Sequence, residues 1–92
     1  FIVNVGRGAV IDEDALAEAI NSGTIAGAAL DVYSVEPPEK ESPILSVKNK
    51  EKIGYTPHTA SSSIEARKRC ISMTADNIEA FIKGEERNDV WR

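Results

Sequence analysis

The apolar and polar positions of the chain fall into short blocks, and each block predicts one structural element. The opening run Phe1-Ile2-Val3-Asn4-Val5 is apolar and β-branched, which predicts a first strand buried on both faces. The acidic segment 12–14 and Gly23 predict the cap and the left-handed stop of a helix between them. Its apolar stripe recurs at helical spacing and consists of Ala15, Leu16, Ala19 and Ile20.

A second strand and a long connection follow this helix. Residues 25–33 are mostly small or apolar, with Asp31 the one charged residue. A helix is the competing interpretation, but the run is short and lies between Gly23 and the pair Pro37-Pro38, which favours a buried strand. Residues 36–52 are rich in proline and charge, so they predict a mostly exposed loop with one short helical turn at 43–45.

The last third of the chain predicts a strand and an amphipathic helix. Residues 52–56 form the predicted strand. Ser62 and Glu65 have the spacing of a capping box, which predicts a helix running to Lys83. Apolar residues recur on one side of this helix, so we expect it to lie against another surface. Trp91 is expected to dock on a partner as well, because an exposed tryptophan is unusual.

The order strand, helix, strand, irregular connection, strand, helix is typical of an α/β parallel sheet. We therefore expect the C-terminal half of a doubly wound parallel sheet, followed by the long C-terminal helix. A strand at the first residue has no preceding element to cover it. For this reason we expect the chain to be a piece of a longer protein.

Composition and charge narrow the possible partners. The net charge of -4 and the pI near 4.9 give no basic field for a polyanion, and Arg67-Lys68-Arg69 is interspersed with acids as on a solvated helix face. We therefore expect no nucleic-acid partner. The single cysteine, Cys70, is expected to be buried or half-buried. With no signal peptide and no apolar run near 20 residues, the sequence predicts a cytoplasmic protein without membrane contact.

Ionisable side chains follow each of the three predicted strands. Arg7 comes just after the first strand, Asp31 and Glu36 lie at and beyond the end of the second, and His58 follows the third across Pro57. Ligands of parallel sheets bind beyond the carboxyl ends of the strands. A guanidinium, a carboxylate and the one imidazole of the chain at this edge indicate proton-coupled chemistry on an anionic substrate.

Each of these side chains also has a purely structural interpretation. Arg7 could pair with Asp12 at the start of the first helix. His58 could be a loop histidine with one ring nitrogen hydrogen-bonded, and Glu36 could be one more solvated acid. Spacing alone leaves these alternatives open.

Three blocks of the sequence, taken together, resemble the signatures of the D-isomer-specific 2-hydroxyacid dehydrogenase family. The blocks run from Val3 to Asp12, from Ala26 through Tyr33 to Glu36-Pro37, and from Thr56 to His58. They agree in order and spacing, and the likeness extends through nearly all of the chain. The resemblance implies the C-terminal part of a Rossmann-like nucleotide-binding domain, with residues 62–92 returning toward a substrate domain.

The resemblance also implies an activity and a set of site residues. Arg7 would orient the substrate carboxylate and carbonyl, His58 would donate and accept the proton, and Glu36 would pair with His58 and favour its protonated form. The reaction would interconvert a 2-hydroxy acid and a 2-keto acid with NAD, in a homodimer without a metal. The residues implied to meet the nicotinamide end of the cofactor are Val5, Gly6, Arg7, Asp31, His58, Thr59, Ala60 and Ser61.

Some family features depart from the pattern or are missing. Gly54-Tyr55 replaces a more usual aliphatic pair, and Thr59-Ala60-Ser61 stands where isoleucine or glycine is common. The Gly-rich pyrophosphate turn, the residue that distinguishes NAD from NADP and the substrate domain are absent from this sequence. NADP is therefore not excluded. Two other classes stay open, a non-catalytic NAD(H)-binding corepressor or sensor of the same fold and a structural α/β fragment without a ligand.

Overall fold

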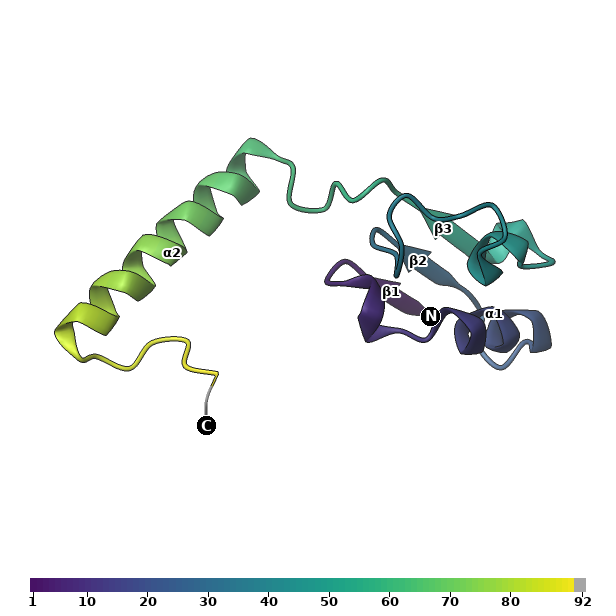
Figure 1. Ribbon diagram of the computed structural model, residues 1–92, viewed down its shortest axis with the longest axis horizontal. Helices are drawn as coiled ribbons and strands as arrows, with labels where there is room; N and C mark the ends of the chain where they lie inside the picture. The colour runs from purple at the N-terminus through teal and green to yellow at the C-terminus, as the bar shows by residue number, and fades with distance from the viewer. Residues whose placement is uncertain (91–92) are drawn as a thin grey trace. The chain divides into compact units, whose positions relative to one another are not determined.

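The computed structural model describes residues 1–90 (Figure 1), so the expectation for Trp91 lies outside the described residues. The chain divides into two compact units, residues 1–60 and the part that begins at Ser61. The first unit contains the sheet and all candidate catalytic residues.

The first unit is built on a parallel sheet of three short strands, β1 (Ile2–Asn4), β2 (Ala28–Leu30) and β3 (Ile53–Tyr55). The strands lie side by side in the order β1-β2-β3, and Asn4, Leu30 and Tyr55 share one row of the register. All three predicted strands are confirmed, although each is shorter than its apolar run. Because the strands are parallel, their carboxyl ends meet at the same edge of the sheet.

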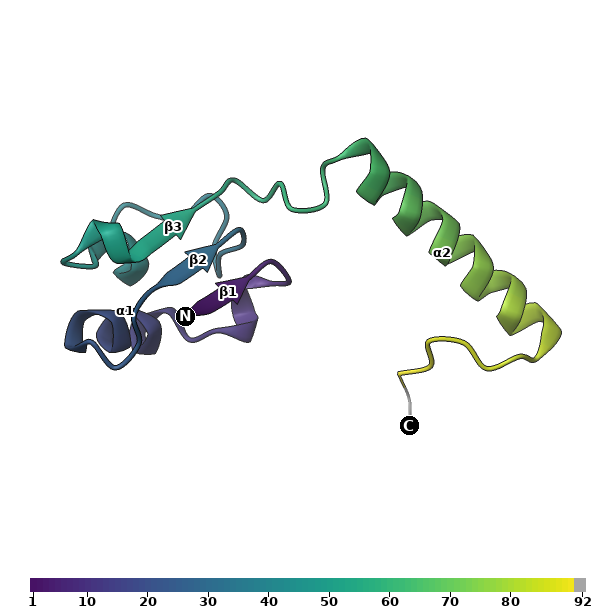
Figure 2. The same ribbon diagram turned by 180° about the vertical axis from the view of Figure 1, so that it is seen from behind.

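Helix α1 (Glu13–Ser22) connects β1 to β2 and covers one face of the sheet (Figure 2). The Asp12 carboxylate accepts a hydrogen bond from the N–H of Ala15, and Gly23 ends the helix with a φ of 79°. Both predicted ends are therefore confirmed. Leu16, Ala17 and Ile20 pack against the sheet residues of that face, which are Ala28, Leu30 and Ile53.

The connection between β2 and β3 is mostly exposed, as predicted, but it also contributes two residues to the core. The predicted turn forms as a 3-10 helix, η2 (Pro43–Ser46), and a second one, η3 (Lys50–Lys52), precedes β3. Ile44 and Val47 are completely buried against α1 and the sheet. The burial of these two residues could not be predicted from the sequence, because isolated apolar residues in a segment rich in proline and charge show no periodicity.

The expectation that the first two strands are buried on both faces is wrong for this chain. Val3 is 69% exposed, and Ala29, its partner in the register, is exposed as well. Both residues lie on the face opposite α1, together with Gly54. No element of residues 1–60 covers that face, so the apolar run of β1 is buried only at Asn4.

The second unit contains α2 (Ile64–Lys83), which ends at Gly84 as predicted, with a φ of 72°. The predicted capping box is wrong by one residue. Ser63, not Ser62, is the N-cap, because its hydroxyl accepts the hydrogen bond from the N–H of Ala66. This places Glu65 one position too early to complete the box.

Most of α2 is exposed, and only Ala80 is fully buried. Cys70 is exposed, so the expectation of a buried or half-buried thiol is wrong. The large apolar residues of the helix are exposed, and they are Ile64, Ile71, Met73, Ile78, Phe81 and Ile82. Among the described residues, neither helix combines the length and the apolar character that crossing a bilayer requires.

Candidate active site

The loop after β1 is organised by the side chain of Asn4, which is buried. Its Nδ2 donates to the carbonyl of Arg7 at 2.9 Å, and its Oδ1 accepts from the N–H of Gly6 at 3.1 Å. The asparagine therefore satisfies its own polar groups by closing a tight loop around Gly6. This loop presents Arg7 at the carboxyl edge of the sheet.

Gly8 brings the loops after β1 and β2 into contact. A Cβ atom on Gly8 would lie 2.0 Å from the backbone carbon and oxygen of Tyr33 and 2.4 Å from the nitrogen of Ser34. Only glycine permits so close an approach of two backbones. The N–H of Ser34 also donates to the Glu13 carboxylate at 2.7 Å, which ties the second loop to the start of α1.

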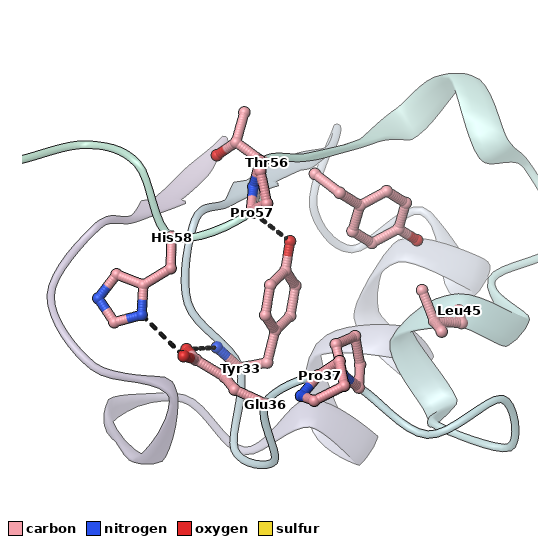
Figure 3. A pocket seen from close by; sticks show the side chains of 9 residues that line it. Tyr33, Glu36, Pro37, Leu45, Thr56, Pro57 and His58 are labelled. Atoms are coloured by element: carbon pink, nitrogen blue, oxygen red, sulfur yellow. Dashed lines mark hydrogen bonds and ion pairs between the residues drawn. The ribbon is translucent and has the colours of Figure 1, made fainter. Parts of the chain in front are cut away.

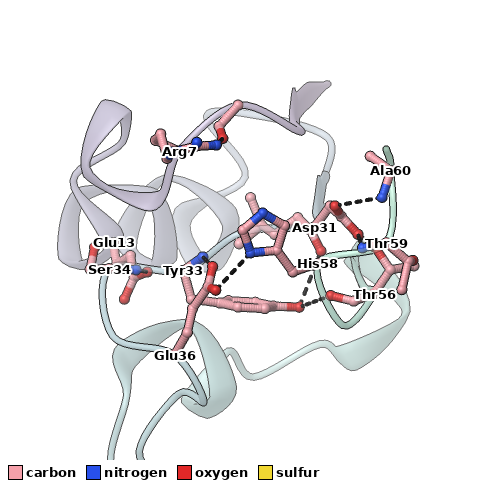
Figure 4. Close-up of polar contacts among 12 residues, drawn as sticks. Arg7, Glu13, Asp31, Tyr33, Ser34, Glu36, Thr56, His58, Thr59 and Ala60 are labelled. Atoms are coloured by element: carbon pink, nitrogen blue, oxygen red, sulfur yellow. Dashed lines mark hydrogen bonds and ion pairs between the residues drawn. The ribbon is translucent and has the colours of Figure 1, made fainter. Parts of the chain in front are cut away.

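Glu36 and His58 form a hydrogen-bonded ion pair across the ends of β2 and β3 (Figure 4). The Nδ1–H of His58 donates to Oε2 of Glu36 at 2.7 Å. The other carboxylate oxygen, Oε1, accepts from the N–H of Tyr33 at 3.1 Å. Because Nδ1 carries the proton of this bond, Nε2 is left to exchange a proton with a ligand.

The electrostatics of the pair favour an ionised carboxylate. The hydrogen bonds from His58 and from the Tyr33 N–H lower the pKa of Glu36, and the charges of His58 and Arg7 act in the same direction. The side chains are 44% and 38% exposed for His58 and Glu36, respectively. An ion pair this exposed contributes little to stability, so its main effect is to orient the imidazole ring.

Asp31 holds the turn on which His58 is carried. Its Oδ1 accepts from the hydroxyl of Thr56 at 2.5 Å and from the N–H of Thr59 at 2.8 Å, and its Oδ2 accepts from the N–H of Ala60 at 2.9 Å. These three hydrogen bonds, with that of Thr56 the strongest, lower the pKa of the Asp31 carboxyl. Asp31 is 4% exposed, and both of its carboxylate oxygens accept hydrogen bonds from the chain around His58.

His58 has a backbone φ of 56°, in the left-handed region. This conformation is uncommon for a residue with a side chain and costs about 1 kcal/mol or more. The hydrogen bonds that Asp31 accepts from residues on both sides of His58 hold it there. The strained backbone aims the ring at Glu36 rather than along the strand.

Arg7 lies close enough to Glu36 to affect its pKa. In the view of Figure 4, Nε2 of His58 points away from Glu36 and toward the side on which Arg7 lies. Arg7 is exposed, and its guanidinium donates to the carbonyl of Gly6 at 2.8 Å. It makes no ion pair with Asp12, whose carboxylate caps α1 instead. The predicted guanidinium, carboxylate and imidazole therefore occur at one rim of the sheet.

A cavity of about 460 Å³ opens beside the ion pair (Figure 3). Figure 3 shows that the Nε2 atom of His58 points away from the rings and aliphatic side chains of this cavity. A carbonyl that meets Nε2 therefore lies outside it. The lining residues are Tyr33, Glu36, Pro37, Pro38, Leu45, Tyr55, Thr56, Pro57 and His58.

Comparison with known proteins identifies the family. The model described as "D-isomer specific 2-hydroxyacid dehydrogenase, NAD binding domain" matches residues 1–60, well over half of the chain. The chain belongs to this family. The predicted α/β fold, a Rossmann-like parallel sheet with helices, is thereby confirmed as that of a 2-hydroxyacid dehydrogenase NAD-binding domain.

Individual 2-hydroxyacid dehydrogenases match nearly the whole chain. A glyoxylate reductase of Korarchaeum cryptofilum is 44% identical over 92% of this chain, and a glyoxylate/hydroxypyruvate reductase B of Pectobacterium carotovorum is 44% identical over 92%. The crystal structure of the Xanthobacter autotrophicus enzyme with NADPH is 38% identical, with a TM-score of 0.63, over 94% of this chain and 34% of that one. The chain spans about a quarter of the length of the two curated relatives, 25% and 26%.

The residues present fit the nicotinamide end of the cofactor that this family binds. Val5, Gly6 and Arg7 are exposed, and a Cβ atom on Gly6 would meet only the Asn4 side chain, at 3.6 Å. A flat ring can therefore lie directly on this backbone. Oδ2 of Asp31 accepts a single hydrogen bond, so it keeps one acceptor position for a carboxamide N–H.

The remaining predicted cofactor residues are placed differently. The N–H groups of Thr59 and Ala60 donate to Asp31 and are not free for a cofactor. Ser61 begins the second unit.

Two residues that shape the candidate site of this chain were missed in the sequence. Asn4 closes the Arg7 loop, and Tyr33 hydrogen-bonds to Glu36. A lone asparagine within an apolar run was the available signal for Asn4, since a buried amide must find partners. The sequence contained no indication of a role for Tyr33, because an aromatic residue at the end of an apolar run is explained by packing alone.

Proposed function

We propose that this chain is the C-terminal part of the nucleotide-binding domain of an NAD(P)-dependent D-2-hydroxyacid dehydrogenase. The enzyme interconverts a 2-hydroxy acid and a 2-keto acid. The 2.7 Å contact between His58 and Glu36, at the rim where Arg7 lies, carries the proposal. This contact gives His58 one committed and one free ring nitrogen, which an acid–base catalyst requires.

Each of the three side chains has a separate role. Arg7 binds the substrate carboxylate with two parallel hydrogen bonds. His58 donates the proton on Nε2 to the carbonyl oxygen during reduction and takes it back during oxidation. Glu36 fixes the ring through Nδ1 and favours the imidazolium, because it stays ionised beside it.

The cofactor completes the reaction at the same rim. Val5, Gly6 and Arg7 would support the nicotinamide ring, and Asp31 would accept a hydrogen bond from its carboxamide. His58, Thr59, Ala60 and Ser61 would border it. When bound, the cofactor supplies or removes the hydride at the substrate carbon. NAD is our first choice, and NADP is the alternative because the Xanthobacter relative was crystallised with NADPH.

The names of the relatives suggest the substrate and the surroundings of the enzyme. We propose a small 2-keto acid such as glyoxylate or hydroxypyruvate, since the relatives are named for these compounds. Residues 62–92 would return toward the substrate domain. We further propose a cytoplasmic homodimer that uses neither nucleic acid nor membrane as a partner.

The decisive experiment is cofactor turnover by the complete enzyme. We expect it to oxidise NADH or NADPH when glyoxylate or hydroxypyruvate is added. A corepressor or sensor of the same fold would instead bind the reduced cofactor with negligible turnover. Cofactor binding without turnover, over a panel of 2-keto acids, would therefore overturn the proposal in favour of the sensor.

Replacing Glu36 with glutamine should move the pH profile of reduction downward. The pKa of Glu36 lies below its ordinary value, so the carboxylate is ionised at neutral pH and glutamine removes a real charge. Without this charge the imidazolium is less favoured, and reduction needs the protonated ring. We therefore expect its alkaline limb to shift to lower pH, with a roughly 10- to 100-fold loss of rate at neutral pH.

The change Glu39→Gln is the matched control for Glu36→Gln. It removes the same charge from an exposed position of the same loop, so the profile should not move. Steady-state rates of the two variants between pH 5 and 10 make the comparison. An unshifted profile for Glu36→Gln would mean that Glu36 does not act on His58 in solution.

A further inference from the structure

Tyr33 hydrogen-bonds to both sides of the Glu36–His58 pair. Its backbone N–H donates to Oε1 of Glu36 at 3.1 Å, and its phenol hydroxyl donates to the carbonyl of Thr56 at 2.7 Å (Figure 4). Thr56 precedes His58 by two residues, with Pro57 between them. One residue therefore contacts the carboxylate directly and also the backbone that carries the imidazole.

The ring of Tyr33 is a rigid support for these two contacts. Tyr33 is 9% exposed and belongs to the core cluster that α1, the sheet and η2 form. Burial raises the pKa of its phenol, and the negative charges of Asp31 and Glu36 raise it further. The hydroxyl therefore keeps its proton and donates to the Thr56 carbonyl at 2.7 Å, the shorter of its two contacts, the other being to the Leu30 carbonyl at 3.2 Å.

A shift of the Thr56 backbone should move the His58 backbone by a similar amount. Pro57 has a fixed φ and restricts the residue before it, so the segment from Thr56 to His58 is stiff. Beyond His58, the chain is held by Asp31 through the N–H groups of Thr59 and Ala60. On the side before the imidazole, the Thr56 hydroxyl donates to Asp31 at 2.5 Å and the Thr56 N–H donates to the Leu30 carbonyl at 3.0 Å, while the Tyr33 hydroxyl is the contact that holds the Thr56 carbonyl.

We propose that the Tyr33 hydroxyl is a positioning group that sets the distance between Nδ1 of His58 and Oε2 of Glu36. It does not touch substrate or cofactor and acts only through the pair. The inference rests on the proposed function, since the pair must act in catalysis for its geometry to matter. Without the hydroxyl, the Thr56 carbonyl relaxes and the contact between His58 and Glu36 loosens.

The test is Tyr33→Phe in the complete enzyme, with Tyr55→Phe as the matched control. Tyr55 also donates its hydroxyl to a backbone carbonyl, that of Ile44 at 2.5 Å, but this bond does not reach the pair. We expect Tyr33→Phe to lower kcat for reduction about three- to tenfold. The alkaline limb should move to lower pH and the cofactor KM should stay within about twofold. Tyr55→Phe should leave all three unchanged.

A double variant separates positioning from general damage. If Tyr33 acts through the pair, Tyr33→Phe should change the rate less than about twofold in a Glu36→Ala background, where the contact is already lost. The inference would be overturned if the rate losses of the two single variants multiplied in the double variant. It would also be overturned if Tyr55→Phe behaved like Tyr33→Phe. A parent enzyme that reduces no 2-keto acid would instead defeat the proposed function.

A spectroscopic measurement tests the geometry without turnover. The Nδ1–H proton of His58 should give a downfield NMR signal in the parent, because it is hydrogen-bonded to the Glu36 carboxylate, with 2.7 Å between Nδ1 and Oε2. This signal should move upfield in Tyr33→Phe and stay in place in Tyr55→Phe. An unmoved signal in Tyr33→Phe would contradict the inference even if activity fell.

Discussion

The change His58→Ala should lower 2-keto acid reduction by the complete enzyme about 10²-fold or more, the typical worth of a general acid or base. This corresponds to about 2.7 kcal/mol of transition-state stabilisation. The loss should appear in kcat, because Nε2 acts on the carbonyl oxygen while Arg7 still binds the carboxylate. Stopped-flow measurement of NADH oxidation at saturating substrate gives the comparison.

Two controls make the His58 result interpretable. The side chain is 44% exposed, so its removal should leave the melting temperature nearly unchanged. Binding of the reduced cofactor, followed by its fluorescence, should also persist within a few-fold. A variant that melts normally, binds cofactor and retains more than a third of the parent rate would rule out His58 as the proton donor.

The change Gly8→Ala should destabilise the protein by about 3 kcal/mol, near the upper limit for forcing a carbon into a packed site. The added methyl group would lie 2.0 Å from the backbone of Tyr33, and neither backbone is free to move. The Arg7 loop is held by Asn4, and the Tyr33 loop is held by Glu13 through Ser34. Activity should fall together with stability, because Arg7 and Glu36 are carried by these two loops.

Gly54→Ala is the control for Gly8→Ala. A Cβ atom on Gly54 would have no neighbour within 4 Å, so the free energy of unfolding should change by about 0.5 kcal/mol or less. Urea unfolding followed by circular dichroism measures both variants. Equal stability of Gly8→Ala and the parent would mean that the two loops are not in contact in solution.

The periodicity of apolar residues and the glycine and proline residues between the apolar runs identified the elements of the fold. Gly23 and Gly84 ended their helices where predicted, since both adopt the left-handed conformation that a helix stop requires. Burial was harder to predict. Val3 is apolar and yet exposed, because a sequence does not say whether its second face has a neighbour. Ile44 is buried although its segment reads as a loop, because burial depends on contacts with distant residues.

The positions of the candidate site residues could be predicted from the sequence, whereas the hydrogen bonds that hold them could not. Arg7, Glu36 and His58 follow the strands whose ends meet in a parallel sheet, so their positions predicted one common edge, whereas their proposed roles came only from the resemblance to the family. The hydrogen bonds of Asp31 were not foreseen, since they depend on the turn after Thr56. The left-handed backbone of His58 could not be foreseen either, because nothing local favours it.

Arg7, Glu36 and His58 all belong to the single unit of residues 1–60. If a hinged enzyme opens to admit substrate and closes for reaction, these groups travel together, and their mutual alignment is preserved through every cycle. The hinge motion then changes only the distance between the substrate and these three groups. In the proposed enzyme, the alignment of these three groups then belongs to one compact unit, and the choice among 2-keto acids can change separately in the parts that move against it.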